Sequence, residues 1–236
     1  MVDSGGRPAD RRPIRAVLFD AVGTLFRSRG TIGEIYSETA RAHGVEASPG
    51  ELDRRFGAIT GSGGMPVDKD GWRSLVAAVF GDTGRFLDYD AFFEDVFAVF
   101  RSANGWRLYP ETATVLRRLS GDGFRLGVVT NFDNRVLEVL DQLGIGRFFD
   151  CVQTPESSGF RKPDPRIFLA AAGSVGTRPE QTLHVGDSPA DDLEGARRAG
   201  MHGLLVDRRE NPPAASFIIH DLEGLFPYVE KGRTGG

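Results

Sequence analysis

The 236-residue sequence contains one cysteine, Cys151. A single thiol cannot form a disulfide within the chain, which fits a reducing compartment, so we expect a cytoplasmic protein. Cys151 lies in the mainly apolar segment 148–152 and is interpreted as a buried structural thiol rather than a nucleophile. The four histidines are also too scattered to form a metal-ligand set, and we expect structural roles for each, including His184 inside a predicted strand.

Long hydrophobic runs and an excess of positive charge are missing too. No window approaches 18 consecutive apolar residues, and residues 1–13 have no hydrophobic segment, so neither a membrane anchor nor a signal peptide is expected. The net charge is -4 and the arginine pairs are scattered, which disfavours nucleic acid and anionic membranes as partners and favours a small-molecule substrate. We expect residues 1–13 and the glycine-rich residues 231–236 to be mobile.

The remaining composition is typical of a globular protein. With 40% hydrophobic and 26% charged residues, the chain can form one sizeable core and an inserted subdomain. The unbroken apolar run 16–19 ends at Asp20, which predicts a strand buried on both faces with an acid at its carboxyl end. Further strands are expected, alternating with helices, near 124–130, 149–153, 182–185, 202–206 and 216–219.

The segment between the first and second strands has a helical pattern instead. Four helices are predicted, beginning near residues 32, 49, 71 and 90, and the regularly spaced phenylalanines of the last are interpreted as core. The predicted fold is therefore α/β: a doubly wound parallel sheet formed by residues 14–26 and 108–230, with a four-helix cap formed by residues 27–107. The functional cleft should lie between them.

Polar residues stand where three of the predicted strands end. Asp20 follows the first strand, Thr130 and Asn131 end the second, and Asp187 follows the strand at 182–185. Since ligands bind beyond the carboxyl ends of the strands in doubly wound sheets, we expect these side chains to meet. Lys162 lies on a proline-stiffened loop that can reach the same cleft.

Four segments resemble, in chain order, the four motifs of the haloacid dehalogenase (HAD) superfamily of hydrolases. They are DAVGTL at 20–25, VVTN at 128–131, KPDP at 162–165 and GDSPADDLEGA at 186–196. The resemblance spans roughly residues 15–228 and includes the place where the first cap type of this superfamily is inserted. Four motifs in the correct order make chance agreement very improbable.

The resemblance implies a hydrolase that uses Mg2+ and an aspartyl intermediate. Asp20 would be the nucleophile, and Mg2+ would be held by Asp20, Asp187 and the backbone carbonyl of Val22. Lys162 would neutralise the anion and keep the nucleophile ionised. The resemblance also implies that Thr130 and Asn131 bind the transferring group, that Gly23 and Thr24 contact substrate, and that Asp192 orients Lys162 or a metal-bound water, whereas Asp191 is more simply a helix cap.

The first motif departs from the family pattern at Val22. Phosphatases of this superfamily normally carry a second Asp there, which protonates the leaving group and then activates water. A general acid–base group is typically worth roughly 10²–10⁴-fold in rate, or about 3–5 kcal/mol. The expected substrate is therefore a small phosphorylated metabolite with a good leaving group of the acyl, aryl or pyrophosphate type.

Other functions fit parts of this pattern. A 2-haloacid dehalogenase needs no acid at Val22, but those enzymes work without metal and lack an acid at the position of Asp187, whose charge beside Asp20 needs a cation. An inactive metal- or ligand-binding module is also consistent, because the chain is similar to a superfamily branch of uncertain activity that has a degenerate first motif and a tryptophan like Trp72. A phosphonate-cleaving enzyme needs a cap lysine, and the only one, Lys69, lies in a predicted loop.

Overall fold

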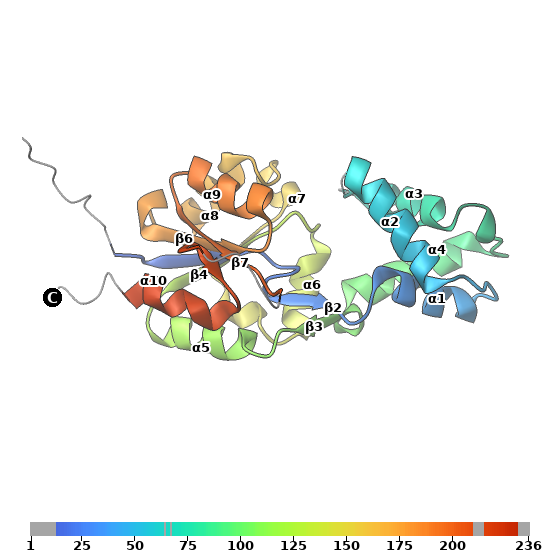
Figure 1. Cartoon of the computed structure of the whole chain (residues 1–236), viewed down its shortest axis with the longest axis horizontal. Helices are drawn as coiled ribbons and strands as arrows, with labels where there is room; N and C mark the ends of the chain where they lie inside the picture. The colour runs from blue at the N-terminus through green and yellow to red at the C-terminus, as the bar shows by residue number, and fades with distance from the viewer. Residues whose placement is uncertain (1–12, 64, 67, 210–214, 231–236) are drawn as a thin grey trace, which may run out of the picture.

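The computed structural model describes residues 13–63, 65–66, 68–209 and 215–230, so the predicted mobile ends lie almost wholly outside the described residues. Figure 1 shows a body of strands and helices beside a separate group that contains the helices labelled α1 to α4. The strands are β1 (Ala16–Phe19), β2 (Phe26–Ser28), β3 (Trp106–Leu108), β4 (Arg125–Val129), β5 (Cys151–Gln153), β6 (Thr182–Gly186), β7 (His202–Val206) and β8 (Ile218–Ile219). The helices are α1 (Ile32–Ala42), α2 (Pro49–Gly63), α3 (Lys69–Phe80), α4 (Tyr89–Arg101), α5 (Thr112–Gly121), α6 (Arg135–Gln142), α7 (Pro155–Ser158), α8 (Pro165–Ser174), α9 (Gly195–Arg198) and α10 (Phe226–Glu230).

Six strands form one parallel sheet in the order β5-β4-β1-β6-β7-β8, which confirms the predicted doubly wound α/β fold. The chain runs outward from β1 through β4 to β5 and then returns to the other side of β1 with β6. This reversal of winding leaves a crevice at the carboxyl ends of β1 and β6, the place where ligands bind in such sheets.

The central strand β1 is buried on both faces. Val17 and Phe19 pack with residues of α5, α6 and α10, whereas Ala16 and Leu18 pack with residues of α8 and α9. Figure 1 shows α5 and α10 on one side of the sheet and α8 and α9 on the other. Because successive side chains of a strand face opposite sides, two apolar faces require an unbroken apolar run. Asp20 is the first residue beyond this strand.

The cap helices α1 to α4 have an apolar core of their own. Tyr36, Phe80 and Phe92 are almost completely buried in it, and their rings contact one another or neighbouring rings. The other core phenylalanines of α4, Phe93 and Phe100, are buried there as well, which confirms the interpretation of their spacing. No helix within the described ranges is long and apolar enough to span a lipid bilayer.

A short antiparallel ribbon joins the cap to the body and was not predicted. Strands β2 and β3 pair so that Arg27 lies opposite Arg107, the two residues at which the predicted cap begins and ends. The ring of Trp106 packs edge-on against Phe26 of the body and Phe100 of the cap. Each of these two strands has three residues with a central arginine and no apolar run, so the sequence pattern gives no sign of them.

Cys151 lies in β5 and is partly buried, with its Sγ 3.8 Å from the carbonyl oxygen of Ala171. Burial raises the pKa of the Cys151 thiol to about 11, and the nearby charge of Asp150 adds to the rise. At neutral pH the group is therefore a thiol, which agrees with a structural role.

Candidate active site

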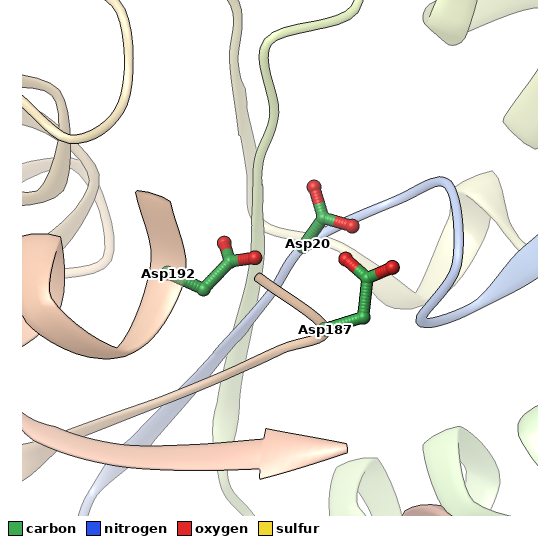
Figure 2. A group of neighbouring side chains, drawn as sticks. All are labelled: Asp20, Asp187 and Asp192. Carbon is green, nitrogen blue, oxygen red and sulfur yellow. The ribbon is translucent and has the colours of Figure 1, made fainter. Parts of the chain in front are cut away.

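Three acidic residues meet at the carboxyl ends of β1 and β6, as Figure 2 shows. Asp20 follows β1, Asp187 follows β6, and Asp192 comes from η5 (Pro189–Glu194), a turn of π-helix. Each offers a carboxylate oxygen within 4.8 Å of the others. Asp20 and Asp192 are buried and Asp187 is exposed. The structure thus brings together three residues that lie up to 172 positions apart in the sequence.

Lys162 lies between two of these acids. Its Nζ is 2.5 Å from Oδ1 of Asp20 and 2.7 Å from Oδ1 of Asp192. Asn131 holds the lysine in place, because its Oδ1 accepts a hydrogen bond from the Lys162 backbone N–H at 2.8 Å and its Nδ2 donates to the Lys162 carbonyl at 3.0 Å. The Asn131 side chain therefore fixes the Lys162 loop, and its contact with substrate stays a prediction.

Asp192 is held by more partners than the sequence indicated. Its Oδ1 also contacts Nε2 of His184 at 2.9 Å, and its Oδ2 accepts from the Ser188 backbone N–H at 3.0 Å. Burial alone would raise the pKa of Asp192, but Lys162 and His184 hold it well below its usual range. His184 is thus part of the site, and the signal was a polar residue between the apolar Leu183 and Val185 of a buried strand.

The charges of the cluster are not balanced. Burial raises the pKa of Asp20 to about 7, Lys162 opposes this rise, and Asp192 and Asp187 add to it. The pKa of Asp187 is also raised, first because neighbouring protein atoms partly desolvate its carboxylate, although the residue as a whole is exposed, and second because of the charge of Asp192. The pKa of Lys162 is raised despite burial, because two carboxylates flank it. One ammonium group facing three carboxylates leaves an excess of negative charge, which a divalent cation would offset.

One atom of Asp20 points to such a cation. Its Oδ2 is buried and has no hydrogen-bond partner among the described residues. An unpaired buried carboxylate oxygen is energetically costly, and carboxylate oxygens are the ligands that Mg2+ prefers. Asp20 and Asp187 therefore fit a Mg2+ site, whereas Asp192, already bonded by Lys162, His184 and Ser188, fits the role of orienting Lys162.

Gly23, in the turn after Asp20, contributes to the site by leaving room for a neighbouring side chain and not by donating a hydrogen bond to a ligand. The Gly23 N–H donates to the carbonyl of Phe26 at 2.8 Å, so this group is not free for the predicted contact with substrate. A Cβ on Gly23, whose φ is +93°, would lie 2.1 Å from Oδ2 of Asp187. Thr24 is fully buried and does not line the cavity that holds Asp20, so the structure does not bring it to the predicted substrate contact.

Substituting Gly23 by Ala is expected to lower Mg2+ affinity about tenfold or more, a typical effect of disturbing the surroundings of a metal ligand. The new methyl group would displace the Asp187 carboxylate. Gly44→Ala is the matched control, because Gly44 also has a positive φ, +74°, but a Cβ there would meet no atom of the described residues within 4 Å. Urea unfolding should show a loss of about 1–2 kcal/mol for both variants. Calorimetry showing unchanged Mg2+ affinity in Gly23→Ala would exclude Asp187 as a ligand.

The acid cluster lines part of a cavity of about 420 Å³ between the body and the cap. Thr130, Asn131 and Lys162 line its polar end, and Thr130 is buried with its Oγ1 accepting from the backbone N–H of Phe132 at 3.1 Å. Val22 is 38% exposed on the cavity wall. An apolar side chain therefore stands at the position for which the family resemblance implies a general acid.

Lys69 is the first residue of α3, whose N-cap is Asp68, so its predicted place in a loop is wrong: the helix begins two residues before its predicted start near residue 71. Its Nζ is 2.7 Å from Oε1 of Glu94 on α4, and it does not line the cavity. This position gives no support to a Schiff base formed by the cap lysine.

A buried ion pair at the cavity was missed in the sequence. Arg135 forms two hydrogen bonds with Asp133, Nε to Oδ1 at 2.8 Å and Nη2 to Oδ2 at 2.6 Å. Trp72 of the cap donates from Nε1 to the same Asp133 Oδ2 at 2.9 Å. In the sequence Asp133 and Arg135 only mark the start of a helix, so their contact with a residue 61 positions away had no local signal.

Comparison with known proteins gives the family. A family model described as haloacid dehalogenase-like hydrolase matches residues 14–200. Human haloacid dehalogenase-like hydrolase domain-containing protein 3 is 33% identical over 226 residues, which cover 90% of this chain and 88% of that protein. A glyceraldehyde 3-phosphate phosphatase from Methanothermobacter thermautotrophicus is 31% identical over 206 residues, 82% of this chain and 86% of the relative. The crystal structure of a HAD phosphatase from Thermococcus onnurineus is similar with a TM-score of 0.67 and 26% identity, covering 94% of this chain and 99% of that one. The chain therefore belongs to the haloacid dehalogenase-like hydrolases.

Proposed function

We propose that this protein is a Mg2+-dependent phosphohydrolase in which Asp20 is the nucleophile. The observation that carries the proposal is the state of the Asp20 carboxylate: Oδ1 is paired with Lys162, while Oδ2 is buried beside Asp187 with no partner in the part of the chain that the structure describes. The similarity to a glyceraldehyde 3-phosphate phosphatase and to a HAD phosphatase supports phosphoryl transfer. The substrate would be a small phosphorylated metabolite with a good leaving group.

Asp20 and Asp187 would hold the Mg2+, which when bound supplies positive charge for the phosphate oxygens and acts as a Lewis acid. Lys162 adds a second positive charge at the same end of the cavity, where it also favours the ionised form of Asp20. The Thr130 side chain lines this end as well, and its hydroxyl would donate a hydrogen bond to a phosphate oxygen.

The reaction would occur in two steps. An oxygen of Asp20 attacks phosphorus, and the bond from phosphorus to the leaving oxygen breaks, with that oxygen keeping the electron pair. Water then attacks the aspartyl phosphate, the bond to Asp20 breaks, and phosphate is released while the proton of the water passes to solvent. Since Val22 can neither donate nor accept a proton, the leaving oxygen has to be weakly basic.

Slow release of phosphate from acetyl phosphate is expected in the presence of Mg2+, and it should stop on addition of a chelator and return with excess Mg2+. Colorimetric phosphate measurement gives the rate. Chloride release from 2-chloropropionate without metal would instead support a dehalogenase. Absence of both reactions, with Mg2+ binding retained in calorimetry, would support a binding module.

A further inference from the structure

Apart from the acid cluster and its polar neighbours, the cavity is lined mostly by apolar and aromatic residues. Phe56 of α2 and Trp72 of α3 line it from the cap, and Phe132 lines it from the body. Met65 lies beside them, 40% exposed, with its carbonyl accepting a hydrogen bond from Nη1 of Arg161 at 3.0 Å. That bond ties the Met65 segment to the loop that carries Lys162, so the apolar wall is fixed close to the phosphate end.

The one guanidinium group among the described residues that line the cavity is not available to an anionic substrate group. Arg135 is 8% exposed and is bonded twice by Asp133. Its charge lies over aromatic rings, 5.0 Å from the centre of Trp72 and 5.1 Å from that of Phe132. A buried, paired charge of this kind polarises the neighbouring rings but offers little to a second anion.

From this arrangement we infer that the leaving group of the substrate is an aryl group, so that the preferred substrates are aryl phosphate monoesters. The inference rests on the proposed function for the phosphate end and on the apolar wall for the other end. A phenyl ring would stack against Trp72, Phe56 and Phe132 and bury apolar surface that a sugar or glycerol could not. Its neighbours would be rings and the Met65 thioether, which interacts well with aromatic groups.

The chemistry of the site agrees with this choice. When Asp20 attacks the phosphorus of an aryl phosphate, the departing phenolate keeps the electron pair of the broken bond and takes its proton from solvent. A phenol has a pKa of about 10, whereas the conjugate acid of hydroxide, water, has a pKa of about 15.7, and alkoxides are similarly basic. An aryl leaving group therefore tolerates Val22 at the position of the missing acid, whereas an alkyl one does not.

The two other good leaving groups fit the cavity less well. Pyrophosphate would put a second highly charged group against the apolar wall, where the charge of Arg135 is already neutralised by Asp133. A small acyl phosphate such as acetyl phosphate could react but would leave the rings of Phe56 and Trp72 uncovered. Turnover of acetyl phosphate therefore tests the phosphohydrolase reaction independently of contacts with the aromatic residues.

Binding of phosphonates, which cannot be hydrolysed at phosphorus, tests the inference separately from turnover. Calorimetry with Mg2+ should show at least about tenfold tighter binding of phenylphosphonate than of methylphosphonate, because burying a ring removes several carbon atoms from water. Met65→Gln is expected to reduce this ratio about fivefold by making the wall polar. Leu87→Gln is the matched control: Leu87 is a fully exposed cap residue outside the cavity, and its substitution should leave the ratio as it is in the wild type.

Equal affinities for the two phosphonates would overturn the inference, and so would a ratio that responds identically to Met65→Gln and Leu87→Gln. Acetyl phosphate turnover decides the proposed function independently. If acetyl phosphate is not hydrolysed but phenylphosphonate still binds about tenfold or more tightly, the proposed function fails and the aryl site stands. If acetyl phosphate and phenyl phosphate are hydrolysed with equal kcat/KM and the phosphonates bind equally, the phosphohydrolase stands and the aryl preference fails.

Discussion

Asp20→Asn is expected to abolish phosphate release from every substrate, a loss of at least about 10³-fold, because an amide cannot form the aspartyl intermediate. The substitution keeps the size of the side chain. Lys162 keeps its other carboxylate partner, Asp192, at 2.7 Å, so the site should retain its shape. The variant should also bind Mg2+ more weakly, since the Oδ2 atom, which has no partner among the described residues, is no longer part of a carboxylate.

The measurement compares phosphate release by the wild type, Asp20→Asn and Asp82→Asn. Asp82 is an exposed cap residue, so its substitution removes one carboxylate without touching the site. Rapid acid quenching followed by mass spectrometry of peptides should find a phosphoryl group on the peptide containing Asp20 in the wild type and in Asp82→Asn, but not in Asp20→Asn. A phosphorylated peptide from another part of the chain, or full activity in Asp20→Asn, would show that the nucleophile has been assigned wrongly.

The body of the fold could be predicted because its signals are local. The apolar run before Asp20 exists because β1 is buried on both faces, and the parallel order of the strands then places Asp187 beside it. Lys162 was predicted as a site residue from the order of the family motifs, because hydrophobic periodicity gives no information about the position of its loop. His184 was passed over since a single buried histidine has many structural explanations, and only its contact with Asp192 shows its role.

The location of the cavity between cap and body could be predicted, but the residues that line it from the cap could not, because they depend on how the cap sits against the body. The placement of the cap is fixed by contacts between distant residues, among them the hydrogen bond from Trp72 to Asp133 and the bidentate pair of Arg101 with Glu138. The residues in these contacts lie 61 and 37 positions apart in the sequence, and no pattern in the chain relates them. Trp72 could be recognised in the sequence as a feature of a related branch, but not as the wall of a cavity.

The second prediction with a large expected effect is a gain of catalytic activity. Val22→Asp is expected to raise the rate of alkyl phosphate hydrolysis by roughly 10²–10⁴-fold, the usual contribution of a general acid–base group. Aryl phosphates should gain much less, since phenolate needs little protonation. Val22 is 38% exposed on the cavity wall, so a carboxylate there can be hydrated and should not unfold the protein. The nearby charges of Asp20 and Asp187 would raise the pKa of the new carboxyl group, which favours the protonated form that a general acid requires.

Leu169→Asp is the matched control for this gain. Leu169 is 43% exposed and lies in α8, and it does not line the cavity. Its substitution by Asp therefore adds the same charge at a similar exposure, but the new carboxylate cannot reach the substrate. The decisive measurement is kcat/KM against the pKa of the leaving group in the wild type and in both variants. The rate should fall steeply with increasing leaving-group pKa in the wild type and in Leu169→Asp, and much less in Val22→Asp. The same steep dependence in Val22→Asp would mean that Val22 does not occupy the position from which a leaving group can be protonated, and that the cap or Lys162 limits the reaction instead.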